Sequence, residues 1–390
     1  MNFKMNGVWT AAGLAAAWLV AAAGAQVSLG AAGDSLTDEY AEGTYNYAMN
    51  WIQQLEQYRA VDLGPTAAEA GQSGGTWGEP RRKFFKNDWA RSGATSASLL
   101  SDGQHTGLAS MAADIDHAVI AIGANDFSPT SSAYINIYFG TWSATQITNY
   151  VNGRIANVTT AVNTLSNAGI KTVIVGFPDY GVAPITYNSG FYSDPVKRER
   201  VSTAIRRVND GLKALARTKK LPYVDLYGLS WAMFGSHTQH NSVLTIGGVN
   251  IKLLENDTTG HTNPLAGFVH DGVHPHTTLQ GLFANVMMTA LDLGYGTDLA
   301  TFSEQEILQH AGLSYGGSDT IAAQIGAWTD YVVNFACLAD VNEDGYVNGN
   351  DYDLFAEWFE SANGRADFNG DGYVNGNDYD EFAEQFESGC

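Results

Sequence analysis

The sequence has few cysteines, few basic residues and few long apolar runs. Two cysteines occur in 390 residues, and 20 Lys and Arg stand against 41 Asp and Glu, which leaves a net charge of −21. Because nucleic acids and anionic membranes attract clustered positive charge, so acidic a chain argues against both as partners. Apolar residues still make up 45% of the chain. This fraction and the length predict one large domain with a sizeable core and a smaller second one.

The long apolar run that does occur stands near the amino terminus. Lys4 precedes an apolar stretch over residues 11–23, and an Ala-Gly-Ala site at residues 23–25 follows. This pattern predicts a secretory signal peptide over residues 1–25, with a buried amino-terminal helix as the alternative. The run is short for a bilayer span, and no later segment is apolar enough for one. We therefore expect a mature chain without a membrane span that is secreted, periplasmic or on the cell surface.

Apolar strands alternate with amphipathic helices through most of the chain. Strands are predicted at residues 27–32, 119–122, 171–177 and 221–226, and helices at 45–57, 93–117, 147–165, 201–215, 279–291 and 318–335, with a capping box at Ser303. Residues 64–83 and 228–268 are expected to be irregular. This alternation predicts an α/β fold in which a parallel sheet carries helices on both faces. Ligand sites in such sheets lie at the carboxyl ends of the strands.

The first strand leads directly into Gly-Asp-Ser-Leu at residues 33–36. A serine at the carboxyl end of a buried strand is a candidate nucleophile, which needs a base and donors for an oxyanion. The alternative is ordinary turn chemistry. A base is available downstream, where Asp271 stands three residues before His274. That spacing lets the carboxylate accept from one ring nitrogen while the other faces Ser35.

Two further strand-end segments offer oxyanion donors. Gly93 lies in a turn where its backbone N–H can approach a substrate closely, and Asn125 ends a buried strand in Gly-x-Asn-Asp. Alone, each is explained as well by a tight turn or a strand-end cap. Together with Ser35, Asp271 and His274, their order along the chain is more specific than any one of them.

These blocks resemble the SGNH (GDSL) hydrolase family over about 250 residues. The resemblance implies a three-layer α/β/α, flavodoxin-like domain over residues 26–335. It implies Ser35 as nucleophile, His274 as general base and then acid, and Asp271 as its orienting partner. It further implies an oxyanion hole from the N–H groups of Ser35 and Gly93 and the Asn125 side chain, with no cofactor for catalysis. Tyr40 departs from the family pattern, where many members have glycine, which affects the expected substrate wall.

The carboxyl-terminal block explains much of the acidity. Residues 337–390 hold 14 acidic residues and one basic residue, and contain two copies of one pattern 27 residues apart. Each copy has oxygen-bearing side chains at loop positions 1, 3, 5, 9 and 12, Gly at 6, and a tyrosine carbonyl expected at 7, which is the arrangement of a calcium loop. The predicted ligands are Asp340, Asn342, Asp344, Tyr346, Asn348 and Asp351, then Asp367, Asn369, Asp371, Tyr373, Asn375 and Asp378.

A helix is expected after each loop, and the duplicated loop-helix unit resembles a dockerin module over residues 337–390. The resemblance implies two Ca²⁺ ions in a small EF-hand-like α-helical module. It also implies a face for a cohesin-like or cell-surface protein, with a calcium-stabilised domain without a partner as the alternative. Cys337 and Cys390 bracket the block. They could form a disulfide in an oxidising compartment, or Cys390 could be an attachment point.

The combined prediction is a secreted serine esterase that hydrolyses carboxylic esters. Because dockerin-like modules accompany polysaccharide-degrading enzymes, an acetylated glycan is the expected substrate. A lipase or general carboxylesterase is the alternative within enzymes. A non-catalytic, calcium-dependent surface-attachment protein is the alternative from another class.

Overall fold

The computed structural model describes residues 26–78, 83–258, 260–335, 339–342, 346–368 and 373–388. The predicted signal peptide and five residues with predicted roles lie outside these ranges; those five are Cys337, Cys390, Asp344, Asn369 and Asp371. Within the described ranges, no helix is long and apolar enough to cross a membrane.

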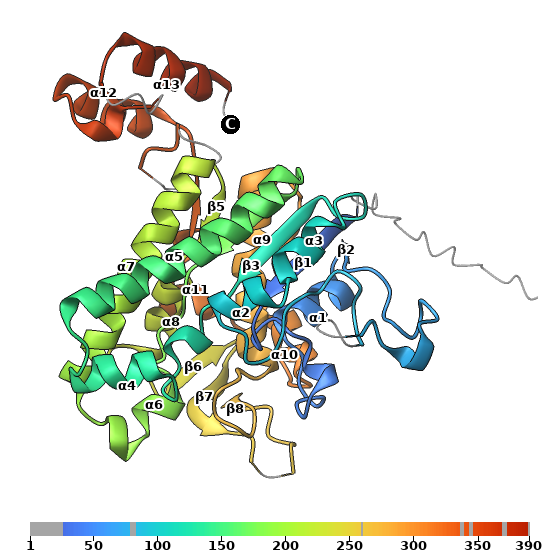
Figure 1. The fold of residues 1–390 in the computed structure, drawn as a ribbon. Helices are drawn as coiled ribbons and strands as arrows, with labels where there is room; N and C mark the ends of the chain where they lie inside the picture. The colour runs from blue at the N-terminus through green and yellow to red at the C-terminus, as the bar shows by residue number, and fades with distance from the viewer. Residues whose placement is uncertain are drawn as a thin grey trace, which may run out of the picture.

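A six-stranded sheet forms the centre of the large domain (Figure 1). Its spatial order is β2 (Val61–Asp62), β1 (Val27–Gly33), β3 (His117–Ala121), β4 (Lys171–Val175), β5 (Pro222–Val224) and β9 (Val332–Asn334). All neighbouring pairs are parallel except β5 and β9, which are antiparallel. Gly33 pairs with Ala121, so the carboxyl ends of β1 and β3 lie side by side. The predicted α/β class with a largely parallel sheet is confirmed.

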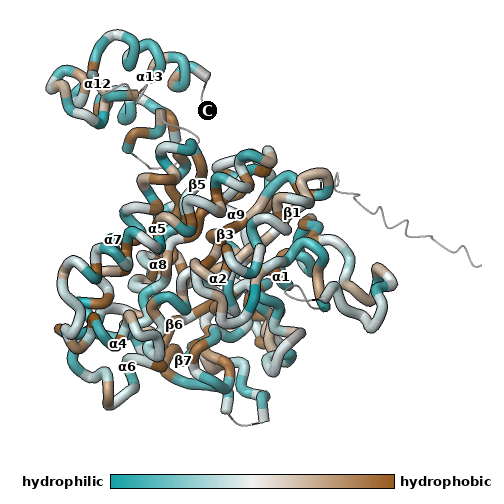
Figure 2. Tube along the Cα trace, in the orientation of Figure 1, coloured by the Kyte–Doolittle hydropathy of each residue, from teal (hydrophilic) through white to brown (hydrophobic). Residues whose placement is uncertain are grey.

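Helices cover both faces of this sheet. Successive strand residues point to opposite sides, so each strand contributes apolar side chains to both faces. On β3, Val119 belongs to the core shared with α1 (Trp51–Tyr58) and α9 (Thr277–Tyr295). Its neighbours Ala118 and Ile120 belong to the core shared with α5 (Ala144–Asn167) and α7 (Pro195–Lys219). Figure 2 shows hydrophobic segments gathered along the central strands. Both faces are therefore buried, as the continuous apolar runs of the strands require.

Several helix boundaries differ from the sequence-based prediction. The helix expected over 45–57 begins only at Trp51, because Asn50 caps it. The helix expected over 93–117 is two short helices, α2 (Ser96–Ser101) and α3 (Gln104–Ala109), separated by Gly103 at φ 73°. The helix expected over 318–335 is wrong. That segment forms α11 (Ile321–Ile325), a 3-10 turn (Trp328–Tyr331) and β9, since the chain returns to complete the sheet.

The region expected to be irregular, residues 228–268, contains regular structure. Its first residues belong to α8 (Leu226–Phe234). The rest form a three-stranded sheet of β6 (Val243–Ile246), β7 (Val249–Asn256) and β8 (Ala266–Phe268). Gly247 and Gly248 join β6 to β7, both at positive φ. A Gly-Gly pair between alternating apolar residues is a hairpin signal, so this error was avoidable.

The remaining elements complete the rim and the carboxyl-terminal module. Near the rim lie α4 (Ser132–Phe139) and α6 (Pro184–Tyr187), and α10 (Glu304–His310) begins at the predicted capping box. Short 3-10 turns occupy Tyr40–Glu42, Ser73–Gly75, Asn125–Phe127, Gly190–Tyr192 and Gly364–Ala366. The module has two helices, α12 (Gly349–Glu360) and α13 (Gly376–Ser388). They pack through Phe355 and Phe382, whose rings stack 3.9 Å apart.

Replacement of Gly33 by alanine is expected to destabilise the large domain by more than about 2 kcal/mol. A Cβ atom at this position would lie 2.3 Å from the backbone oxygen of Ala121, which the sheet holds in place. Gly153→Ala is the matched control, because nothing lies within 4 Å of its Cβ position in α5. That control should stabilise the protein by up to about 1 kcal/mol. Urea unfolding of both variants measures the effect, and equal stability would contradict the steric argument.

Candidate active site

The Ser35 turn is held by hydrogen bonds to the end of β1. The side chain of Gln104 accepts from the N–H of Gly33 at 2.9 Å and donates to its carbonyl oxygen at 3.1 Å. The Asp34 carboxyl then accepts from the N–H groups of Leu36 and Ala124, both at 3.1 Å. These contacts join the end of β1 to α3 and to the loop after β3. Ser35 itself is half-buried at the turn.

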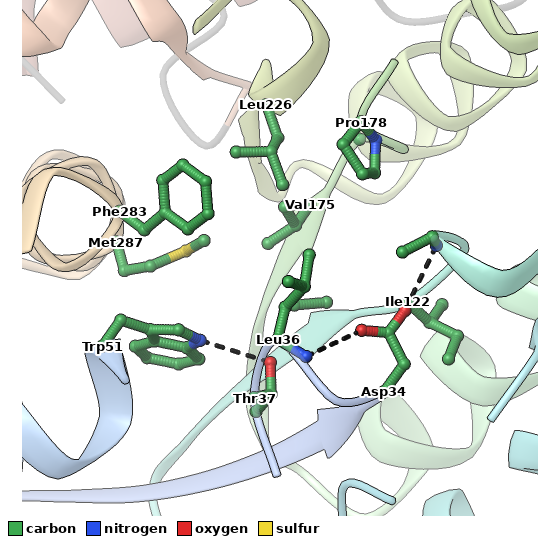
Figure 3. A pocket seen from close by; sticks show the side chains of 13 residues that line it. Asp34, Leu36, Thr37, Trp51, Ile122, Val175, Pro178, Leu226, Phe283 and Met287 are labelled. Carbon is green, nitrogen blue, oxygen red and sulfur yellow. Dashed lines mark hydrogen bonds between the residues drawn. The ribbon is translucent and has the colours of Figure 1, made fainter. Parts of the chain in front are cut away.

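Asp34 is a buried carboxyl group within this turn. Burial raises its pKa from the ordinary value to about 7, although the N–H groups of Leu36 and Ala124 and the charge of His274 act in the opposite direction. In Figure 3, Asp34 lies next to Leu36, whereas Trp51 and Phe283 lie on the far side of Leu36, and all of them line a cavity with otherwise mostly apolar walls. That cavity measures about 10 Å³, which is room for about one water molecule.

The structure brings Asp271 and His274 together as the sequence predicts. The Nδ1 atom of His274 lies 2.6 Å from the Oδ2 atom of Asp271. The other carboxylate oxygen accepts from the N–H groups of Val273 and His274, at 2.8 and 3.1 Å. Burial would raise the pKa of Asp271, but the hydrogen bond and charge of His274 and these N–H groups outweigh it and lower the pKa to about 2. Asp271 is therefore anionic at neutral pH.

Two tyrosines support the loop that carries this pair. The hydroxyl of Tyr45 donates to the same Oδ2 atom of Asp271 at 2.8 Å, and its ring centre lies 4.7 Å from that of His274. Tyr40 is buried and donates to the carbonyl oxygen of Pro275 at 3.0 Å, while Gln280 donates to the Tyr40 hydroxyl at 2.7 Å. Tyr40, which stands where many members of the family have glycine, thus anchors this loop.

The segments around Gly93 and Asn125 are held against each other. The side-chain amide of Asn125 donates to the carbonyl oxygen of Ala94 at 3.0 Å. The next residue, Asp126, accepts from the N–H of Ser96 at 2.7 Å. Gly93 itself is exposed at φ 81°, with open space at its Cβ position. A backbone N–H at such a position can approach a substrate closely.

The Gly93 segment is also fastened to the Ser35 turn. Asp38 accepts from the N–H of Ser92 at 2.7 Å, and the guanidinium of Arg91 lies 3.3 Å from the same carboxylate. The serine turn, the glycine segment and the asparagine segment are therefore one hydrogen-bonded unit. The charge of His274 acts on Asp34 in this unit. Burial raises the pKa of Tyr180, and the charges of Asp34 and Asp271 raise it further.

No hydrogen bond joins Ser35 to His274 within the described residues. The Nε2 atom of His274 is buried and has no hydrogen-bond partner in that part of the chain. Hydrogen bonds between catalytic groups are often long in the absence of substrate and shorten when it binds. The free Nε2 atom is the nitrogen that the sequence analysis expects to face Ser35.

Sequence reasoning missed the residues that hold these groups. Gln104, Asp38, Asp126 and Tyr45 make decisive contacts, yet none has a local motif that distinguishes it from an ordinary polar residue. Asp38 and Asp126 lie within four residues of Ser35 and Asn125, which is the one signal that could have found them. Trp51, the first residue of α1, is 1% exposed and donates to Thr37, so it belongs to the core.

A second Ser, His and Asp group occurs deep in the domain. His237 lies 3.2 Å from Asp179 and 3.1 Å from the hydroxyl of Ser202, which also donates to Asp179. Ser202 is completely buried in the middle of α7, so a substrate cannot reach it. Ser202 and Asp179 satisfy each other within this group, and the Nδ1 atom of His237 lies 3.3 Å from the Glu199 carboxylate, so the group has a structural explanation.

The acidic loops of the module are partly described. Asp351 and Asp378 at loop position 12 are completely buried. The Asp351 carboxylate accepts from the N–H groups of Asn342 and Asn348, at 3.1 and 2.9 Å, so it closes its loop. Asn375 donates to Asp378 in the same way at 2.8 Å. Asp340, Tyr346, Asp367 and Tyr373 belong to the same two loops, and among the described residues no three carboxylates or imidazoles form a cluster that could hold a metal ion.

The sequence model of the GDSL-like lipase/acylhydrolase family matches residues 31–277, and the chain belongs to this family. The match spans all five predicted active-site residues. The protein is accordingly an ester-hydrolysing enzyme of the GDSL (SGNH) type. A search of curated proteins found no match.

Several solved structures are similar to this chain at low identity. The crystal structure of TesA is 17% identical, covering 68% of this chain and 97% of that one, with a TM-score of 0.34. A catalytic mutant of Axe2, an acetylxylan esterase from Geobacillus stearothermophilus, is 14% identical over 53% and 79%, with a TM-score of 0.32. The lipase Lip_vut3 from a goat rumen metagenome is 14% identical over 64% and 90%, with a TM-score of 0.36.

The raised pKa of Asp34 predicts a pH-dependent stability. Between about pH 4 and pH 7 the unfolded chain has an ionised Asp34, whereas the folded protein keeps the proton. The contribution of Asp34 to the free energy of unfolding is therefore largest below about pH 4 and is lost as the pH rises to about 7. Urea unfolding of the wild type and of Asp34→Asn at several pH values measures this, because only the variant lacks the titration. Parallel pH curves would contradict the prediction.

Proposed function

We propose that the protein is a secreted serine esterase that removes acetyl groups from a polysaccharide. The observation that carries this proposal is the Asp271–His274 pair, in which the Nε2 atom of His274 is buried without a hydrogen-bond partner among the described residues. A carboxylate on Nδ1 fixes the tautomer in which Nε2 can accept a proton. The anionic state of Asp271 then stabilises the imidazolium that forms.

In the proposed reaction, the Ser35 hydroxyl oxygen attacks the ester carbonyl carbon while His274 accepts its proton. The N–H groups of Ser35 and Gly93 and the side-chain amide of Asn125 stabilise the oxyanion. His274 then donates the proton to the departing sugar hydroxyl, which leaves an acetyl group on Ser35. A water molecule, deprotonated by His274, attacks this acyl-enzyme. Collapse of the second intermediate releases acetate and restores the serine.

One observation supports a hydroxylated alcohol over a lipid. The groove between α6 and β7, beside Asp271, has a volume of about 600 Å³ and is lined mainly by polar side chains. Among them are Asn188, Asn256 and Asn263, whose amides can both donate to and accept from sugar hydroxyls. A polyhydroxylated alcohol suits these surroundings better than a lipid does.

Ser35→Ala is expected to reduce turnover of a short-chain aryl acetate and of acetylated xylan by at least about three orders of magnitude. The reason is the loss of the nucleophile from an otherwise intact site. A fluorophosphonate probe should label the wild type and not this variant. Ser101→Ala at the end of α2 serves as the control and should keep both activities. Labelling or turnover that survives in Ser35→Ala would remove Ser35 from the mechanism.

We also propose that two Ca²⁺ ions fold the carboxyl-terminal module, which then tethers the enzyme to a cohesin-like or cell-surface protein. Support comes from the buried carboxylates of Asp351 and Asp378, each of which closes its loop. Buried like charges in one loop repel one another unless a cation neutralises them. The remaining predicted oxygen ligands in the described loops are Asp340, Asn342, Tyr346, Asn348, Asp367, Tyr373 and Asn375.

Removal of calcium with EDTA is expected to unfold this module while the large domain keeps its esterase activity. The fluorescence of Trp358 and the far-ultraviolet circular dichroism of α12 and α13 report the change. Asp351→Asn should raise the calcium concentration needed for folding by about tenfold or more. The control is Asp353→Asn, an exposed acid outside the loop pattern. Identical melting with calcium and with EDTA would contradict the proposal.

A further inference from the structure

The Asp271 carboxylate has a donor beyond those that its own loop supplies. Its Oδ2 atom lies 2.6 Å from the Nδ1 atom of His274 and accepts from the Tyr45 hydroxyl at 2.8 Å. Its Oδ1 atom accepts from the N–H groups of Val273 and His274. Three of these four donors belong to the loop of Asp271, whereas Tyr45 lies 226 residues earlier in the sequence. The oxygen that holds the imidazole is therefore shared with a side chain from another part of the fold.

Tyr45 is the donor in this hydrogen bond at every ordinary pH. Burial raises the pKa of Tyr45 to about 12, and the hydrogen bond to Asp271 and the negative charge of Asp271 contribute to the shift. The pKa of Asp271 is lowered to about 2, so this residue is the acceptor. Between these limits the hydroxyl proton of Tyr45 is directed at the Oδ2 atom.

The ring of Tyr45 also packs against the imidazole. The two ring centres lie 4.7 Å apart, and the ring planes meet at 33°. The ring of Tyr40 lies nearly perpendicular to the imidazole, with the centres 6.0 Å apart, and it packs against the ring of Tyr45 at 5.5 Å. His274 is 8% exposed. Because its Nδ1 atom is bonded and two rings pack against it, the imidazole is held with Nε2 in one direction.

The sharing of Oδ2 affects how strongly Asp271 stabilises a protonated His274. A hydroxyl proton neutralises part of the negative charge of the carboxylate oxygen that accepts it. The same oxygen faces Nδ1, so less charge remains to stabilise the imidazolium. A neutral imidazole can accept the serine proton, whereas an imidazolium cannot. The Tyr45 hydroxyl thus keeps the base available at a lower pH than Asp271 alone would allow.

Ionisable groups from several segments surround this pair, and removal of the Tyr45 hydroxyl leaves them in place. They are Asp34 of the Ser35 turn, Tyr40 and Tyr47 of the segment before α1, Tyr180 after β4, and His270 beside Asp271. Asp34 releases its proton near pH 7 and therefore contributes to the pH profile of the wild type and of the variants alike. A change that follows removal of the hydroxyl is consequently assigned to Tyr45.

We propose that Tyr45 is a positioning residue for ester hydrolysis, whose hydroxyl sets, through Asp271, the lowest pH at which His274 accepts the serine proton. Its ring holds the imidazole in the orientation that this transfer requires. The proposal rests on the proposed function, because it takes Asp271 as the orienting carboxylate and His274 as the base. It gives Tyr45 an effect on the rate and the pH dependence of the reaction, beyond its support of the loop.

The test compares the wild type with Tyr45→Phe, which keeps the ring and removes the hydroxyl. The value of kcat/KM for a short-chain aryl acetate is measured from about pH 4 to about pH 9. Its acid limb is expected to move to higher pH by about 0.5 to 1 unit, because Asp271 then stabilises the imidazolium with its full charge. Its plateau should stay within about tenfold of the wild type. Tyr45→Leu also removes the ring and should lower kcat at least about tenfold with little change in KM.

The matched control is Tyr315→Phe, because the Tyr315 hydroxyl donates to the carboxylate of Asp319 at 2.9 Å in the segment after α10. This control should keep both the plateau and the acid limb of the wild type. The rate of fluorophosphonate labelling at Ser35 is a second readout, since it requires the base and involves no ester substrate. Its pH dependence should shift in Tyr45→Phe in the same direction.

Two outcomes would overturn the proposal. An acid limb that stays in place in Tyr45→Phe, whatever the plateau, means that Tyr45 has only a structural role. A shift of equal size in Tyr315→Phe means that the effect does not act through Asp271. A wild type that the fluorophosphonate probe does not label would refute the proposed function, whereas a labelled wild type with an unmoved limb in Tyr45→Phe would refute only the role of Tyr45.

Discussion

The carboxyl group of Asp34 is the constraint on which the arrangement of the active site depends. It is buried, yet it accepts from backbone N–H groups on both sides of the sheet edge, one in its own turn and one after β3. Because a buried carboxyl without donors is costly, the two strand ends are held at one separation. This contact therefore fixes the position of the Ser35 segment relative to the Asn125 segment. Asp38 and Asp126 then extend the same network to the Gly93 segment.

The loop that carries Asp271 and His274 is positioned differently. Its supports come from far along the chain, through the hydroxyl groups of Tyr40 and Tyr45. Each tyrosine has an apolar ring that packs against neighbouring rings and a polar tip that reaches the loop. The aromatic segment between the Ser35 turn and α1 therefore holds His274, the proposed general base, in position. This arrangement ties both side chains to the loop through their hydroxyl groups.

Short-range patterns in the sequence predicted the parallel sheet, the long helices and the Asp271–His274 contact. The strands at Val119 and Val173 and the helix ending near Gly169 have strong periodicity, which local reasoning captures well. The contacts of Gln104 and Tyr45 could not be predicted, because they join residues far apart in the sequence. The edge strand β9 has only three residues, which carry little local signal, so the sequence predicts a helix there. The sheet of β6 and β7 was missed although its Gly-Gly turn was visible.

The direction of β9 determines where the carboxyl-terminal module joins the large domain. Val332 pairs with Val224 and Asn334 with Pro222, so the chain leaves the large domain at the amino ends of the parallel strands. Ser35 and Asn125 lie at the opposite ends of those strands. Figure 1 accordingly shows α12 and α13 at the far end of the molecule from α6 and β7. In the proposed tethering, the module would therefore attach at the end of the large domain opposite Ser35, and the active site would face away from the point of attachment.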